Sequence, residues 1–129
     1  MMVAWNDYKT IARDRGALAL ELYVVESTPQ KAPDDVKQCL PAHLEYQREL
    51  EWRGVLALAG PLSDPTGEAM EGAGLIVYRA GSMAEAKQFA EDDPMHQSGV
   101  RGFTLRKWLV NEGSVSLNVG LSTGKAQLS

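Results

Sequence analysis

The sequence predicts a single α+β domain with a four-stranded antiparallel sheet and its helices on one face. Residues 17–25, "ALALELYVV", alternate in the manner of a strand, and "PAHLEYQRELEWRG" (41–54) repeats its apolar residues at helical spacing. Between and after these segments the two patterns recur in the order strand, helix, strand, strand, helix, strand. The 129 residues are enough for one domain, and 44% hydrophobic with 23% charged residues is ordinary for a globular chain.

The net charge and the distribution of apolar residues argue against two classes of partner, nucleic acids and membranes. The net charge is −4, whereas binding to nucleic acid needs a basic face. No apolar run approaches the roughly 18–20 residues that span a bilayer, and charges interrupt the first fifteen residues where a signal peptide has its apolar core. We therefore expect a cytoplasmic protein that binds neither nucleic acid nor membrane.

The first half of the chain divides into a helix, a strand and a second helix. Residues 5–15 form a short amphipathic helix that Asn6 could cap, and the strand 17–25 has apolar residues on both faces. The connection after it contains two prolines. Asp34 is expected to cap a first turn, and Pro41 to begin the longer helix that ends at Gly54. One side of that helix carries Leu40, His43, Leu44, Gln47 and Leu50.

The second half supplies three more core elements and a tail. Strands are predicted at 55–60, 74–80 and 100–110, with a long loop between the first two. Ser82 and Glu85 match the capping box S-x-x-E, which predicts a helix from about 83 to 91. The tail at 114–122 alternates apolar and polar residues, which predicts an extra strand or arm, on this subunit or on a partner. The predicted division is an N-terminal helix (1–16), a core (about 17–112) and a C-terminal arm (113–129).

The order β-α-β-β-α-β is that of the ferredoxin-like fold, in which both helices cover one face of the sheet. The opposite face is then open. Because the strands carry apolar residues on both sides, we expect an identical subunit to cover that face, which makes the protein a homodimer.

The stretch "EDDPMHQSGV" (91–100) places Asp92 and Asp93 where a helix ends, which is unfavourable because the helix dipole is negative there. In the predicted topology the two helices are neighbours, so a carboxylate from this turn can reach His43. A carboxylate on one ring nitrogen orients an imidazole for general acid–base catalysis, and Pro94 restricts the conformation of Asp93. The alternatives are a hydrogen-bonded core histidine and an aspartate that only forms the turn.

The other candidate residues are few. His96 is expected at the surface or at the pocket rim, where it could contact substrate. Cys39 is the only cysteine, which excludes an intramolecular disulfide, and it is more typical of a small half-buried residue than of a nucleophile. Histidine-pair zinc motifs, the P-loop, the dinucleotide fingerprint and the nucleophile elbow are all absent, so we expect no metal and no nucleotide cofactor.

Five short motifs occur in the order found in the YciI-like (YCII-related domain) family, which this chain resembles over roughly residues 18–112. They are His43-Leu44, Ala59-Gly60-Pro61, Glu85-Ala86, Asp93-Pro94 and Gly99-Val100. The resemblance implies a ferredoxin-like fold, dimers packed through their sheets, and a pocket with His43 and Asp93 as a catalytic pair. Gly60 and Pro61, from the second of these motifs, and His96, beyond Pro94, are predicted to be substrate-binding residues.

The function implied by the resemblance is that of a small enzyme without a cofactor. One branch of the family is similar to a dehydrochlorinase, and muconolactone isomerases and small monooxygenases share the fold. We expect lyase, isomerase or dehydrochlorinase-like chemistry on a small organic acid or aromatic-derived compound. A non-catalytic module that binds a small ligand or regulates is the alternative, and an oxygenase without cofactor rests on the fold alone.

Overall fold

The computed structural model describes residues 2–129; Met1, the first residue of the predicted domain, lies outside them. The chain forms two compact units, one of Glu21–Trp108 and one of Met1–Leu20 with Leu109–Ser129. The predicted core of about 17–112 is thus four residues longer at each end than the larger unit. That the whole chain acts as one domain stays a prediction.

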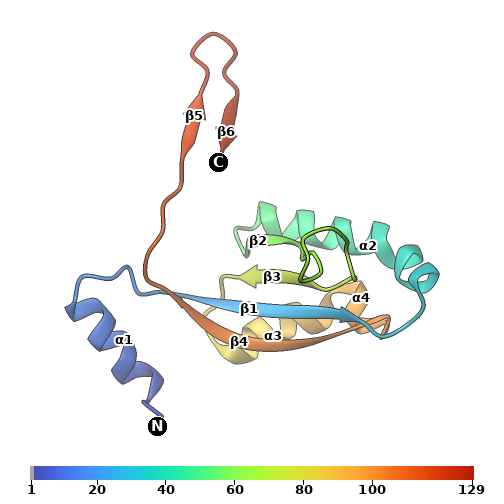
Figure 1. The fold of residues 1–129 in the computed structure, drawn as a ribbon, viewed down its shortest axis with the longest axis horizontal. Helices are drawn as coiled ribbons and strands as arrows, with labels where there is room; N and C mark the ends of the chain where they lie inside the picture. Colours follow the sequence, from blue (N-terminus) through green and yellow to red (C-terminus); the bar gives the residue numbers. More distant parts are fainter. Residues whose placement is uncertain (1) are drawn as a thin grey trace. The chain divides into compact units, whose positions relative to one another are not determined.

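The larger unit contains a four-stranded antiparallel sheet with the strand order β2-β3-β1-β4 (Figure 1). The strands are β1 (Leu20–Pro29), β2 (Leu56–Pro61), β3 (Gly74–Tyr78) and β4 (Arg101–Val110). Strand β3 pairs with both β1 and β2. With its helices, this sheet confirms the predicted α+β, ferredoxin-like fold.

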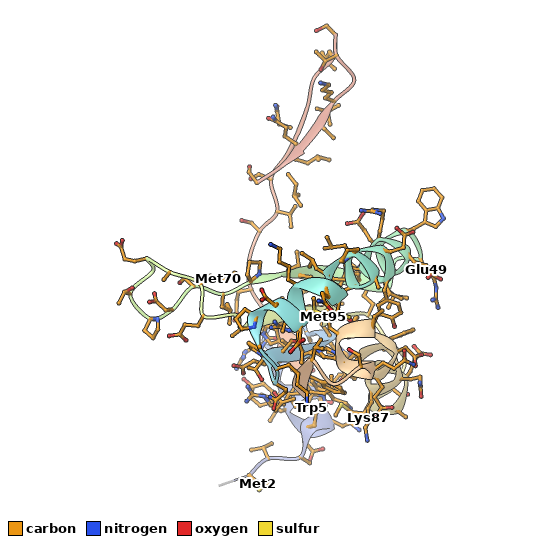
Figure 2. The ribbon with its side chains drawn as sticks, turned by 90° about the vertical axis from the view of Figure 1, so that its right-hand side faces the viewer. Met2, Trp5, Glu49, Met70, Lys87 and Met95 are labelled. Carbon is orange, nitrogen blue, oxygen red and sulfur yellow. The ribbon has the colours of Figure 1, made fainter. Side chains whose placement is uncertain are left out.

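The hydrophobic core lies between the sheet and two helices, α2 (Pro33–Trp52) and α3 (Met83–Asp92). Alternate residues of two neighbouring strands supply one side of it, Tyr23 and Val25 from β1 and Ile76 and Tyr78 from β3. Leu50, Ala86 and Ala90 supply the helical side, and all seven are at most 5% exposed. Because residues two apart share one face of a strand, both helices cover the same face of the sheet, as predicted. Figure 2 shows Met95 among the helices, whereas Glu49 and Lys87 point outward.

One prediction about α2 was wrong. The helix runs without a break from Pro33 and includes Pro41, which had been expected to start a second helix. Proline lacks the N–H that would bond to the carbonyl of Lys37, so the helix continues through Pro41 with this one backbone hydrogen bond missing. Ala32 is the N-cap and Pro33 takes the first helical position, so the predicted cap at Asp34 was also wrong.

Strand β1 continues beyond its predicted end at Val25. The residues up to Pro29 had been predicted as a connection, yet Glu26 pairs with Leu75 and Ser27 with Gly74. Pairing with β3 outweighs the weak strand propensity of this segment, which tertiary context commonly does. The extension brings Ser27 to the end of the sheet where the candidate site lies.

The capping box at the start of α3 is present, with one difference. Ser82 accepts a hydrogen bond from the backbone N–H of Glu85. The Glu85 carboxylate in turn accepts from the N–H of Gly81, one residue before the cap. Both contacts satisfy donors at the start of the helix, which is what the motif predicts.

The smaller unit contains helix α1 (Trp5–Asp14) and a hairpin of β5 (Leu117–Val119) and β6 (Ala126–Leu128). Helix α1 is where it was predicted, but Ala4 is its N-cap and Asn6 lies inside it. The predicted C-terminal arm, 113–129, thus contains the whole hairpin; the strand expected at 114–122 is its first half, β5, and the second strand, β6, was not predicted. Among residues 2–129, no helix is both long enough and apolar enough to span a membrane.

Candidate functional site

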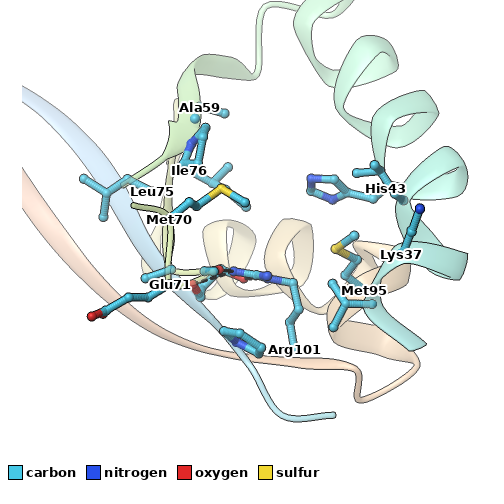
Figure 3. Close-up of a pocket in the computed structure, with 18 of the residues that line it drawn as sticks. Lys37, His43, Ala59, Met70, Glu71, Leu75, Ile76, Met95 and Arg101 are labelled. Carbon is cyan, nitrogen blue, oxygen red and sulfur yellow. Dashed lines mark hydrogen bonds between the residues drawn. The ribbon is translucent and has the colours of Figure 1, made fainter. Parts of the chain in front are cut away.

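A pocket of about 690 Å³ opens in the larger unit beside helix α2 (Figure 3). Its walls come from one face of α2, the ends of β1 and β2, the loop before β3, and the start of β4. Most of the lining is apolar, and the polar side chains are few, as in typical small-molecule sites. These polar side chains are Ser27, Lys31, Lys37, His43, Gln47, Glu71 and Arg101.

The stripe predicted on α2 forms one wall of this pocket. Leu40, His43, Leu44 and Gln47 all line it, whereas Leu50, one turn further along, is fully buried in the core. Leu40 and Leu44 are 40% and 45% exposed, which is high for apolar residues on the inner side of a helix. The first two turns of this stripe therefore line the pocket and are not packed in the core.

His43 and Asp93, fifty residues apart, are in direct contact. The Nδ1 atom of His43 lies 2.9 Å from Oδ1 and 2.8 Å from Oδ2 of Asp93. The side chain of Asp93 is 0% exposed, and that of His43 is 15% exposed. A carboxylate only accepts hydrogen bonds, so Nδ1 donates and the lone pair of the neutral imidazole is on Nε2. Figure 3 shows the ring projecting from α2 into the pocket.

The position of Asp93 explains the acidic residues at the end of α3. Asp93 ends α3 and is also the N-cap of a further short helix, α4 (Pro94–Gln97), where Oδ1 accepts from the N–H of Met95 at 3.0 Å. An acid at a helix N-terminus is favourable, so this carboxylate serves α4. Helix α4 packs against α2, which places the carboxylate against His43. Asp92 is exposed and accepts from Gln88 within α3.

Two tyrosines lie in the electrostatic environment of Asp93 and stay protonated. Burial raises the pKa of Tyr46 to about 12, and its hydroxyl donates to the carbonyl of Phe89 at 2.7 Å. Burial also raises the pKa of Tyr78. Neither phenol lines the pocket, and neither is poised to give up a proton near neutral pH.

His96 was predicted at the surface or at the pocket rim, and the structure places it at neither. It is half-buried, its ring packs on that of Phe103 at 4.7 Å, and it does not line the pocket. Its Nδ1 lies 2.8 Å from the carbonyl of Ala90 and its Nε2 lies 2.8 Å from Oγ of Ser27. Because a carbonyl only accepts, Nδ1 carries the proton and Nε2 accepts from the serine hydroxyl. Burial lowers the pKa of His96, consistent with this neutral form.

The same serine holds an arginine that the sequence reasoning missed. The Nε atom of Arg101 donates to Ser27 Oγ at 2.8 Å, and its Nη2 donates to the Ser27 carbonyl at 2.8 Å and to the Gly72 carbonyl. Gly72 has a φ of +106°, and a Cβ there would lie 2.8 Å from Cγ of Pro29. Only glycine fits both restrictions, so the loop that presents this carbonyl depends on it.

The predicted substrate-binding pair of β2 and the lone cysteine differ in their relation to the pocket. Gly60 and Pro61 line the pocket at the end of β2. Cys39 lies outside the lining, half-buried, with its Sγ 3.8 Å from Oγ of Ser98. Within the described residues, no group of three or more His, Cys, Asp or Glu side chains is arranged to hold a metal ion.

Comparison with known families identifies the larger unit. The model of the YCII-related domain matches residues 21–108, which is the extent of that unit. The chain belongs to the YCII-related domain family. The resemblance seen in the ordered motifs of the sequence is thereby confirmed. No curated protein matches the chain.

A solved structure of similar fold is 5-chloro-2-hydroxyhydroquinone dehydrochlorinase (TftG) from Burkholderia phenoliruptrix AC1100, in complex with 2,5-dihydroxybenzoquinone. The two chains share 21% identity with a TM-score of 0.52, and the match covers 67% of this chain and 92% of the other. At this identity the similarity is evidence for the fold alone.

Proposed function

We propose that this member of the YCII-related domain family is a small acid–base enzyme that needs no cofactor. Its substrate would be a small organic acid or an aromatic-derived compound, and its reaction a lyase, isomerase or dehydrochlorinase-like step. The observation that carries the proposal is the contact between His43 and the fully buried Asp93, with the histidine ring in the pocket wall.

In this proposal His43 is the general base and then the general acid. Asp93 accepts the Nδ1 proton, so Nε2 is free to remove a proton from a molecule bound in the pocket. When the ring becomes an imidazolium, the neighbouring carboxylate stabilises its charge. The proton then returns to another atom of the substrate, or stays until a leaving group departs.

A dehydrochlorinase-like reaction in this pocket needs no oxidant or reductant. His43 removes a proton from the substrate, and chloride leaves with the electron pair of the C–Cl bond while a new double bond forms. The net change is loss of HCl. This version is chosen by analogy with the structural neighbour, which is by its name a dehydrochlorinase, and the mostly apolar pocket with its few polar groups suits such a substrate.

The remaining predictions about the site belong to the same proposal. Gly60 and Pro61 would contact the substrate from the end of β2, where they line the pocket. His96 would act one step removed, through its hydrogen bond to Ser27. The protein would be a homodimer in which the open face of the sheet is covered by a second subunit; Leu58 on β2 and Trp108 on β4, 60% and 44% exposed, are apolar surface of the sheet strands.

A panel of chlorinated hydroxyhydroquinones and small lactones tests the function. The measurements are chloride release, lactone isomerisation and the thermal shift caused by each compound. We expect turnover of at least one compound by the wild type and a loss of about 10²- to 10⁴-fold in His43→Gln, the usual contribution of general acid–base catalysis. Thermal shifts without turnover would instead favour a non-catalytic binding module.

A further inference from the structure

The pocket contains a second functional group, opposite His43, that the acid–base proposal does not use. We propose that Arg101 is an anion receptor and that the ligand of this pocket is a small organic anion, a carboxylate or the anion of an acidic quinol. This inference rests on the proposed function for the identity of the site, but it concerns binding rather than the proton transfer.

The guanidinium of Arg101 is held by neutral groups only. Two of its nitrogens, Nε and Nη2, make the hydrogen bonds to Ser27 and to the Gly72 carbonyl. No described residue accepts a hydrogen bond from Nη1. Two N–H donors of a rigidly held arginine are therefore available to a molecule in the pocket that Arg101 lines.

The charge of Arg101 is not matched by a carboxylate in contact. It is half-buried, and in the part of the chain that the structure describes no Asp or Glu oxygen forms an ion pair with it. A charge removed from water is normally paired with an opposite charge, whereas the hydrogen bonds of this guanidinium go to carbonyl and hydroxyl oxygens. An anionic ligand would supply the missing partner.

The charges around the pocket favour the same kind of ligand. Lys31, Lys37 and Arg101 line it, against one carboxylate, that of Glu71. The protein as a whole has a net charge of −4, so this local excess of positive charge runs against the overall balance. A concave site lined by one sign of charge attracts ligands of the opposite sign.

The placement of Arg101 suits the proposed chemistry. Figure 3 shows His43 projecting from α2 on one side of the pocket and Arg101 on another side, beside the loop that carries Glu71. A ring bound between them would present an anionic oxygen to Arg101 and a proton to His43. Negative charge that develops on the ring oxygens after proton removal would be stabilised by the same guanidinium.

The experiment compares two probes that differ in charge but share a ring. In 2,5-dihydroxybenzoquinone the hydroxyl groups are conjugated with carbonyls and are acidic, so the compound is an anion near neutral pH; 2,5-dimethoxybenzoquinone is neutral. Isothermal titration calorimetry at low salt measures the affinity of each. A hydrogen bond to a charged group predicts that wild type prefers the anion by about 10- to 100-fold.

Variants assign this preference to the arginine. Arg101→Gln should reduce the preference for the anion to less than about threefold, which is what general electrostatic attraction would still contribute. Arg48→Gln is the matched control, since Arg48 is an exposed arginine on α2, outside the pocket lining, whose side chain pairs with the exposed Glu45, and it should keep the preference. Thermal melting verifies that each variant is folded.

Two results would overturn the proposal. One is equal affinity of the wild type for the two probes, which requires no variant to fold. The other is a folded Arg101→Gln protein that binds the anion as the wild type does. His43→Gln should keep the preference while losing turnover. A wild type that prefers the anion but turns over none of the substrate panel would reject the proposed enzyme and leave the anion site standing.

Discussion

Replacing Asp93 by asparagine or by alanine separates its two roles. In the wild type the carboxylate caps α4 through the N–H of Met95 and accepts from Nδ1 of His43. Alanine removes both contacts; loss of a cap costs about 0.5–2 kcal/mol and loss of a hydrogen bond to a charged group about 1.5–3 kcal/mol, about 2–5 kcal/mol together. Asparagine keeps an oxygen for the cap, so we expect it to cost about 0.5–2 kcal/mol less than alanine.

The asparagine variant also makes a prediction about the histidine ring. With the amide oxygen capping α4, the amide N–H₂ faces Nδ1, which must then accept. The imidazole is expected to move its proton to Nε2, which removes the base from the pocket although the ring stays in place.

Urea unfolding measures the free energies, and ¹⁵N NMR of the imidazole of His43 measures the tautomer. Asp92→Asn and Asp92→Ala are the controls, because Asp92 is exposed and its side chain accepts a hydrogen bond from Gln88 within the same helix; both should stay within about 0.5 kcal/mol of the wild type. The reasoning is refuted if Asp93→Asn destabilises as much as Asp93→Ala, or if His43 keeps its proton on Nδ1 in Asp93→Asn.

Four further substitutions test the surroundings of the site. Burial lowers the pKa of His96 below its ordinary 6.5, so the contribution of neutral His96 to stability is complete above that pH and is lost as pH falls toward the folded-state pKa. Between about pH 7.5 and about pH 5, the free energy of unfolding in urea should therefore fall less for His96→Gln than for the wild type. The buried Tyr78 hydroxyl has no hydrogen-bond partner among the described residues, so Tyr78→Phe should match or exceed the wild type in thermal melting, whereas Tyr46→Phe loses its bond to Phe89 and should cost about 1 kcal/mol. Gly72→Ala places a side chain at a positive φ, and its Cβ would clash with Pro29, so it should lower the melting temperature. Affinity for 2,5-dihydroxybenzoquinone should also fall, because the Gly72 carbonyl that holds Arg101 moves. An unchanged affinity would count against this role of the loop.

Patterns confined to one element were predictable from the sequence. The alternation of the core strands, the capping box at Ser82 and the order of elements led to the observed fold. The order of elements also led to the approach of His43 and Asp93, because it makes their two helices neighbours. Their role in catalysis stays a prediction.

The error at Pro41 is local, whereas the omissions at the site depend on contacts between distant parts of the chain. Pro41 reads locally as a helix start, and only the continuous turn before it shows otherwise. Ser27 reads as a loop residue until its pairing with Gly74 is known. Arg101 could not be singled out, since its environment comes from β1 and from a loop near Gly72, both far away in the sequence.

A double-mutant cycle of His43→Gln and Asp93→Asn tests the central claim most directly. The measurement is kcat/KM of the wild type, the two single variants and the double variant for the compound of the substrate panel that the wild type turns over fastest. If the two residues form one acid–base unit, each single change lowers kcat/KM by about 10²- to 10⁴-fold and the double variant loses little more than the worse single variant. A double loss equal to the product of the single losses, or no turnover of any panel compound by the wild type, would contradict the account.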